Sequence, residues 1–154
     1  MAALAADRTF ESHPTGRNQY EILVSDICYA GSLVGLSAAG FLHPWDDVAT
    51  TVFVGVALEQ AAGASASPAG TDTKCPVHDE GMIIKNIPIA SAVQASVGLD
   101  VHCTTDNVLA DCVLDGGATS RAIGRIIRWV SAADCDIQLY SAQEWQARYK
   151  QATT

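Results

Sequence analysis

The stretch Thr50-Thr-Val-Phe-Val-Gly-Val-Ala-Leu58 decides the fold class. β-Branched and aromatic side chains fill it, and such residues suit the pleated, half-buried surface of a sheet. Glu59 and the small residues of Ala61–Gly70 follow, which predicts a flexible loop after the strand. The sequence therefore predicts a β-strand at Thr50–Leu58 and a sheet built around it.

Similar short apolar runs lie on both sides, separated by turn residues such as Gly31-Ser32 and Asp115-Gly-Gly117. Phe41–Asp47 is predicted to be a loop or turn. The runs with strand character are Tyr20–Tyr29, Leu33–Leu36, Lys74–Val77, Gly81–Ile89, Val97–Cys103, Val108–Leu114, Ala122–Val130 and Asp136–Tyr140. About six to nine short strands at such intervals predict an all-β fold, either a small β-barrel or a β-sandwich.

The two ends of the chain differ from this β-domain. Residues 1–19 are polar and without periodicity, which predicts an extended N-terminal arm, either disordered or laid along a partner. Ser141-Ala-Gln-Glu144 is a capping-box pattern. It begins either a short C-terminal helix or a frayed tail, because a helix of about two turns is marginal alone. The predicted organisation is an arm at 1–19, a β-domain at 20–140, and a helix and tail at 141–154.

The composition excludes several kinds of partner. The net charge is −8, whereas nucleic-acid binding needs a basic stripe on the protein. No apolar run approaches the roughly 20 residues of a membrane span, and the first residues lack the basic segment of a signal sequence.

Only 17% of residues are charged and 49% are hydrophobic, which favours apolar surface buried between subunits. The five cysteines are predicted to be free thiols in a reducing cytoplasm.

Candidate chemical sites all have simpler explanations. None of the four histidines lies in a nucleophile signature such as Gly-x-Ser-x-Gly, so we predict no catalytic residues, no enzyme activity and no cofactor. Cys75-Pro-Val-His78, His102, Cys103 and Cys112 form the alternative, a zinc site. Adjacent residues on a strand point to opposite faces, so His102 and Cys103 cannot both reach one ion. Buried free cysteines are the preferred interpretation.

Four motifs in order carry a resemblance to a known family. They are Gly31-Ser-Leu-Val-Gly-Leu36, the strand Val52–Leu58 with its acidic residue and small-residue loop, Val97–Asp106, and Ala122–Val130 with Asp136–Tyr140. Over residues 30–140 the chain resembles the small β-barrel capsid decoration (cement) proteins of tailed bacteriophages. The long arm and the tail after Tyr140 depart from the simplest members, which leaves the docking geometry open.

The resemblance implies a structural protein of the virion, made in the host cytoplasm and located on the outer capsid surface. It implies binding to the major capsid protein of the mature head, often as a homotrimer, and stapling of neighbouring subunits. The expected contact surfaces are the arm, the Pro44-Trp45 loop, where an exposed aromatic would be an interface anchor, and the tail. Candidate contact residues are Arg8, Phe10, Arg17, Tyr20, Pro44, Trp45, Trp145 and Tyr149.

Two alternatives stay open. One is another virion subunit, such as a head-tail joining or tail component, which would occur in about a dozen copies instead of hundreds. The other is a small β-barrel enzyme or zinc-binding β-domain built around Cys75 and His78.

Overall fold

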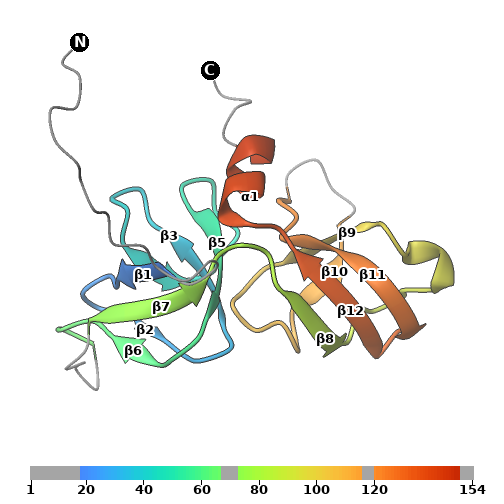
Figure 1. Cartoon of the computed structure of the whole chain (residues 1–154), viewed down its shortest axis with the longest axis horizontal. Coiled ribbons are helices and arrows are strands. Elements are labelled where there is room, and N and C mark those ends of the chain that lie inside the picture. Colours follow the sequence, from blue (N-terminus) through green and yellow to red (C-terminus); the bar gives the residue numbers. More distant parts are fainter. Residues whose placement is uncertain (1–17, 67–72, 116–119, 150–154) are drawn as a thin grey trace, which may run out of the picture.

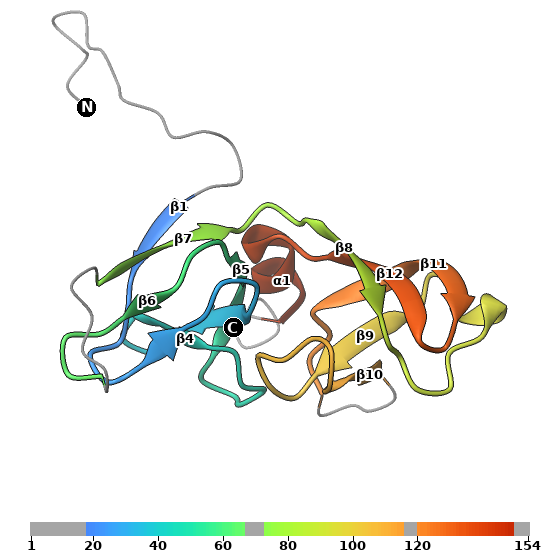
Figure 2. The ribbon, with the colours of Figure 1, turned by 90° about the horizontal axis from the view of Figure 1, so that it is seen from below.

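The structure is a computed structural model that describes residues 18–66, 73–115 and 120–149. These residues form three antiparallel sheets and one short helix, and the two larger sheets lie side by side along the long axis (Figures 1 and 2). We call the part built from β1 to β7 the N-terminal lobe and the part built from β8 to β12 the C-terminal lobe.

The described residues of the N-terminal lobe form seven strands. They are β1 (Asn18–Glu21), β2 (Ile27–Cys28), β3 (Leu33–Leu36), β4 (Leu42–Pro44), β5 (Val52–Ala57), β6 (Ala61–Ala62) and β7 (Lys74–His78). Five of them form a sheet in the order β1-β7-β5-β3-β4, and β2 pairs with β6 in a small second sheet. An isolated parallel bridge between Ile22 and Leu42 brings the two edges of the larger sheet together at one point.

As far as the structure describes it, the C-terminal lobe is one five-stranded sheet in the order β10-β9-β11-β12-β8. Its elements are β8 (Ile83–Ile87), the short 3-10 helix η1 (Gln94–Ser96), β9 (Asp100–Cys103), β10 (Cys112–Leu114), β11 (Gly124–Ser131) and β12 (Asp134–Leu139). Strands β11 and β12 form a hairpin in which Ser131 pairs with Asp134, and two irregularities in register bend it. Such irregularities increase local twist.

Two hydrophobic cores result from this arrangement. An inner core fills the N-terminal lobe with small and branched residues, among them Cys28, Val54 and Val77. A shared core joins the lobes and takes Phe53 from β5 and Ile137 from β12. All six residues of β5 are buried, because the strand has one core on each face.

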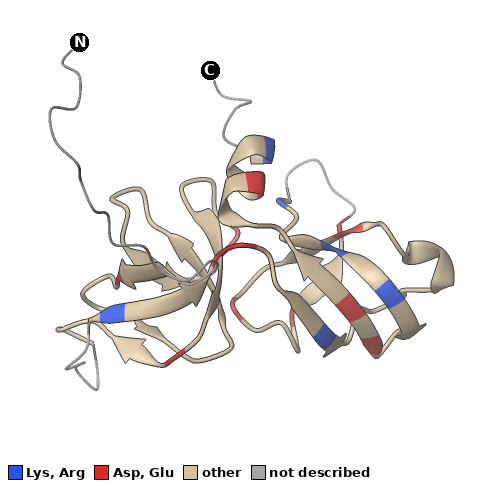
Figure 3. Cartoon of the chain, viewed as in Figure 1, with Lys and Arg blue, Asp and Glu red and all other residues tan. Residues whose placement is uncertain are grey.

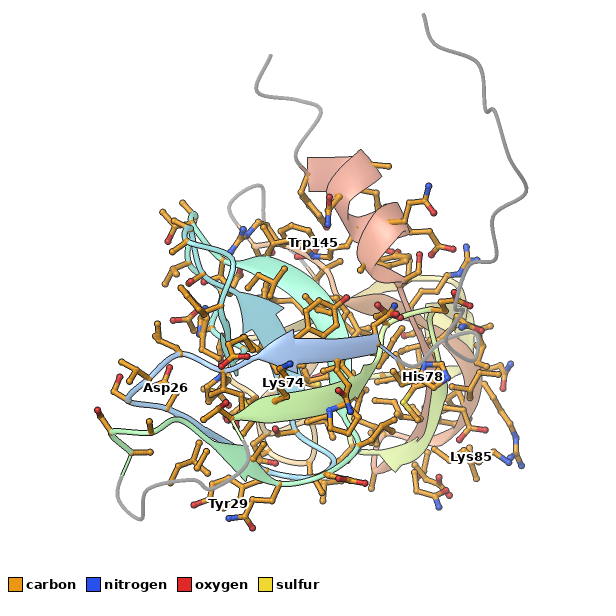
Figure 4. The ribbon with its side chains drawn as sticks, turned by 60° about the vertical axis from the view of Figure 1, so that its left-hand side comes forward. Asp26, Tyr29, Lys74, His78, Lys85 and Trp145 are labelled. Carbon is orange, nitrogen blue, oxygen red and sulfur yellow. The ribbon has the colours of Figure 1, made fainter. Side chains whose placement is uncertain are left out.

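Helix α1 (Ala142–Tyr149) leads from the end of β12 back to the N-terminal lobe, where it packs against β5. The Ser141 half of the predicted capping box is present, since the Ser141 hydroxyl accepts a hydrogen bond of 3.0 Å from the Glu144 amide. The helix is therefore confirmed, and a frayed tail across these residues is wrong. Trp145 belongs to this helix, and its side chain is 1% exposed on the side that faces the sheets (Figure 4). The shared core therefore extends to α1.

The predicted all-β class is confirmed, with two packed sheets that fit the sandwich. Within the described ranges no sheet closes into a barrel. The clearest predicted strand forms β5, and Leu33–Leu36 forms β3 as predicted.

Three predicted boundaries and loops are wrong. Phe41–Asp47 contains the short strand β4, and the predicted flexible loop at Ala61–Gly70 begins with the buried strand β6. Strand β1 begins at Asn18, inside the arm predicted at 1–19. Residues 1–17 of that arm and residues 150–154 of the predicted tail lie outside the described residues.

Candidate functional site

A charged cluster of three side chains, Asp47, His102 and Arg121, lies where the two lobes meet. Asp47 follows β4, His102 lies on β9, and Arg121 precedes β11. The Asp47 carboxylate lies 2.7 Å from His102 Nε2 and accepts a 2.9 Å hydrogen bond from Arg121 Nε. The side chain of Asp47 is 9% exposed, so these contacts are largely shielded from solvent and strengthened.

The Arg121 guanidinium holds this junction together through further contacts. It donates to the carbonyl oxygens of Thr51, at 2.8 Å, and of Val48. Its central carbon also lies 5.5 Å from the Trp45 ring centroid and 5.1 Å from that of Trp145, within cation–π range. One side chain of the C-terminal lobe thus binds the loop after β4, a core tryptophan and the helix.

Trp45 was expected to be an exposed interface anchor, and that expectation is wrong. It is 2% exposed, and its indole Nε1 donates a 2.6 Å hydrogen bond to the Cys103 carbonyl on β9. It packs edge-on against Phe53 at 5.4 Å and Trp145 at 6.0 Å between ring centroids. The physical reason is that β4 pairs with β3 immediately before Trp45, and the indole then lies among partners from both lobes and the helix.

The candidate contacts at the C-terminal end are also part of this junction. Trp145 is buried, and Tyr149 packs against it with ring centroids 4.9 Å apart. The Tyr149 hydroxyl accepts a 2.6 Å hydrogen bond from the Ala122 amide, and burial raises the pKa of that hydroxyl. These two aromatic residues fasten the helix onto the lobes, so Trp145 has no exposed surface to offer a partner.

The remaining candidate contacts lie apart from the cluster. Tyr20 on β1 is half-buried and donates a 2.6 Å hydrogen bond to Asp79, which also accepts one of 2.7 Å from Asn18. Burial, followed by the hydrogen bond to Asp79, raises the pKa of the Tyr20 hydroxyl. Pro44 is half-buried at the end of β4. The candidates Arg8, Phe10 and Arg17 lie outside the described residues.

The cluster is suited to neutralising charge and joining lobes. His102 Nε2 is occupied by Asp47, and the neighbouring Cys103 points to the opposite face of β9, into the shared core. The contact joins two loops and one strand that are distant in sequence, with Asp47 and Arg121 separated by 74 positions. No local motif indicates such a pair, which is why the sequence did not reveal it.

The residues of the zinc alternative are divided between the two lobes. Cys75 is buried in the inner core of the N-terminal lobe, whereas Cys103 and Cys112 lie in the shared core. His78 is three residues from Cys75 on β7, so their side chains point to opposite faces. Among the described residues no group of three or more histidine, cysteine or acidic side chains is placed to hold a metal ion.

The outer end of the C-terminal lobe carries an apolar surface that the sequence did not single out. The loop around η1 lies along β11, since the Gly98 amide donates to the Ile126 carbonyl at 2.7 Å. Five large hydrophobic side chains there are 38–54% exposed. This tip patch consists of Val93, Val97, Leu99, Ile127 and Val130.

The two lobes differ in their content of basic residues. In the N-terminal lobe Lys74 is the one described basic residue, whereas Lys85, Arg121, Arg125 and Arg128 belong to the C-terminal lobe (Figure 3). Arg128 on β11 is 67% exposed and lies 3.5 Å from Asp136. Basic side chains thus share β11 with the apolar residues of the tip patch.

Comparisons with known protein families, with curated proteins and with solved structures found no match to the chain. None of the helices in the described residues has the length and apolar character needed to cross a membrane.

Proposed function

We propose that the chain is a capsid decoration protein, which binds the outer surface of a mature phage head and stabilises the shell by bridging major capsid subunits. The tip patch is the observation that carries this proposal in the structure. Its exposed side chains come from one loop and the adjoining strand, and they are held on a rigid sheet. Exposed apolar side chains grouped on neighbouring segments of a small protein are typical of a protein–protein interface.

The rigidity of the body supports a bridging function. The shared core, the tryptophan pair and the Asp47–Arg121 contact hold the lobes in a fixed relation. A ligand that binds only the expanded shell stabilises that state by mass action. A body whose lobes are fixed to each other, with apolar surface at one end, suits such binding. The ordered strand motifs of the resemblance add to this support.

The acidic composition agrees with an outer position. The formal net charge is −8, so the protein has no electrostatic attraction to packaged nucleic acid. Arg128, on the same strand as part of the tip patch, can pair with an acidic group of the partner beside the apolar contact. Such pairing favours the correct orientation of the two bound proteins.

Co-sedimentation with expanded, empty capsids tests the proposal. We expect saturable binding of the full chain to expanded shells, at hundreds of copies per particle, and none to precursor shells. About a dozen copies would instead support the head-tail joining alternative. Absence of the wild-type chain from the capsid pellet would contradict both.

A matched pair of variants tests the tip patch itself. Leu99→Glu places a charge in the patch, and we expect about a tenfold or greater loss of capsid affinity. Leu109→Glu is the control, because Leu109 is 63% exposed but lies in the loop between β9 and β10. Equal losses for the two variants would contradict a contact at the tip patch.

A further inference from the structure

Two of the five cysteines face each other across neighbouring strands. Cys103 on β9 and Cys112 on β10 are directly opposite in the antiparallel register. Both side chains point into the shared core, and they are 0% and 3% exposed. The Cys112 thiol lies 2.9 Å from the Cys103 sulfur, whereas the hydrogen bonds of Cys75 and Cys135 go to backbone carbonyls.

The backbone geometry suits a covalent bond between them. Residues directly opposite in an antiparallel pair have Cα atoms about 4.5 or 5.5 Å apart, and both values lie within the roughly 4.4–6.8 Å range of disulfides. A disulfide bond is about 2.05 Å long, so rotation of the side chains closes the remaining gap without moving the strands.

We propose that Cys103 and Cys112 form an intramolecular disulfide when the protein meets an oxidising medium, and that this bond locks the junction between the lobes. The inference stands independently of the proposed capsid role. A reducing cytoplasm would keep the pair as thiols, and an extracellular environment would allow it to oxidise.

The reaction needs a named oxidant, and a low-molecular-weight disulfide such as oxidised glutathione supplies it. The thiolate of one cysteine attacks the small disulfide, which forms a mixed disulfide and releases one small thiol. The second cysteine then attacks the protein sulfur of that intermediate and releases the other small thiol. The protein loses two protons and two electrons in total, and the small disulfide takes them up as it is reduced to two thiols.

Access to the pair requires local opening. Strand β10 has three residues and is the outer strand of its sheet, so it is held by β9 alone among the strands of that sheet. Short edge elements open locally at low free-energy cost. The hydrogen bond to Cys103, together with burial, raises the pKa of the Cys112 thiol, so oxidation is expected to be faster at alkaline pH.

The bond would act on the contact between lobes. It closes the loop 104–111, whose Asp106 carbonyl accepts a 3.0 Å hydrogen bond from the Leu33 amide in the N-terminal lobe. The Cys103 carbonyl also accepts the hydrogen bond from Trp45. Cross-linking this hairpin restricts the unfolded chain and holds both acceptors in place.

The test compares reduced full-length protein with protein treated to constant thiol content with excess oxidised glutathione. We expect the thiol count, measured after denaturation, to fall from five to three. Peptide mapping should find residues 103 and 112 linked. The Tm should rise by about 5–10 °C, as expected for a disulfide that closes a loop of about ten residues.

Variants separate this pair from the other thiols. Cys112→Ala should abolish the Tm rise on oxidation, and the control Cys135→Ala, also buried but on β12, should keep it. A parallel sample refolded from the reduced, denatured state in a glutathione buffer removes any limit on access to the thiols. Five remaining thiols by both routes, stable glutathione adducts, or a link between other cysteines would overturn the proposal.

Discussion

Strands β5 and β11 both look like β-sequences but lie in opposite environments. Both contain a glycine and branched apolar residues, yet all six residues of β5 are buried, whereas only Gly124 and Ile126 of β11 are. The difference arises because β5 has a core on each face and β11 on one. Apolar residues on the open face of β11 therefore contribute little to folding, and that is where a contact with a partner can be sought.

The largest expected effect is a loss of stability on substitution in β5, the buried strand. Phe53→Ala should lower the free energy of unfolding by about 3–5 kcal/mol, because it removes a ring packed against Trp45 in the shared core. Ile127→Ala on β11, where the side chain is 38% exposed, is the matched control and should cost less than about 1 kcal/mol. Urea denaturation measures both, and similar losses would contradict the contrast.

The next largest effect concerns the two arginines next to and within β11. Arg121→Ala leaves the largely buried Asp47 without its guanidinium partner, and we expect a loss of about 2–3 kcal/mol. Arg125→Ala removes an exposed arginine four residues later and should change stability by less than about 0.5 kcal/mol. Equal values for the two variants would mean that the charged junction does not hold the lobes together.

A smaller effect is expected at the start of the helix that covers β5. Ser141→Ala removes the hydroxyl that accepts the Glu144 amide hydrogen bond, and such caps contribute about 1 kcal/mol. Thermal unfolding followed by circular dichroism measures the change. Ser141→Asp restores an acceptor at the same place and should recover most of the lost stability, whereas no recovery would contradict a capping role.

The most subtle effect is a dependence on alkaline pH. Burial, and then the hydrogen bond to Asp100, raises the pKa of Tyr140 from 10.0 to about 12. The folded protein therefore retains that proton where the unfolded chain loses it, so this stability is full below pH 10 and disappears as pH rises towards 12. Denaturation curves give the difference in unfolding free energy between wild type and Tyr140→Phe, and this difference should be smaller at about pH 11 than at about pH 9. An unchanged difference between the two pH values would contradict the assignment.

The sequence predicted those parts of the fold that local chemistry determines. The β-branched run at 50–58 and the capping pattern at Ser141 are strong local signals, and β5 and α1 formed as expected. Strands β4 and β6 were missed because Pro44 and two alanines have little intrinsic strand preference. Their strand conformation comes from pairing with β3 and β2, which a local pattern does not contain.

The site was harder to predict for a related reason. Trp45 lies beside a proline between two short elements, which favoured an exposed loop, but the space it fills is formed by β9 and α1, far along the chain. The Asp47–Arg121 contact and the opposed cysteines depend on the same long-range pairing. Composition could indicate apolar surface, but not that it would lie at the outer end of the C-terminal lobe.

The contact between Trp45 and Trp145 also sets the order in which the protein can fold during synthesis. The two residues are 100 positions apart. At the roughly 5–20 residues per second of translation, about 5–20 seconds pass between the synthesis of Trp45 and that of Trp145. The inner core draws on residues 22–77 for its buried members and can begin to assemble early. The tryptophan face of the N-terminal lobe lacks its cover throughout that interval, and transiently exposed apolar surface of this kind favours aggregation of a nascent chain.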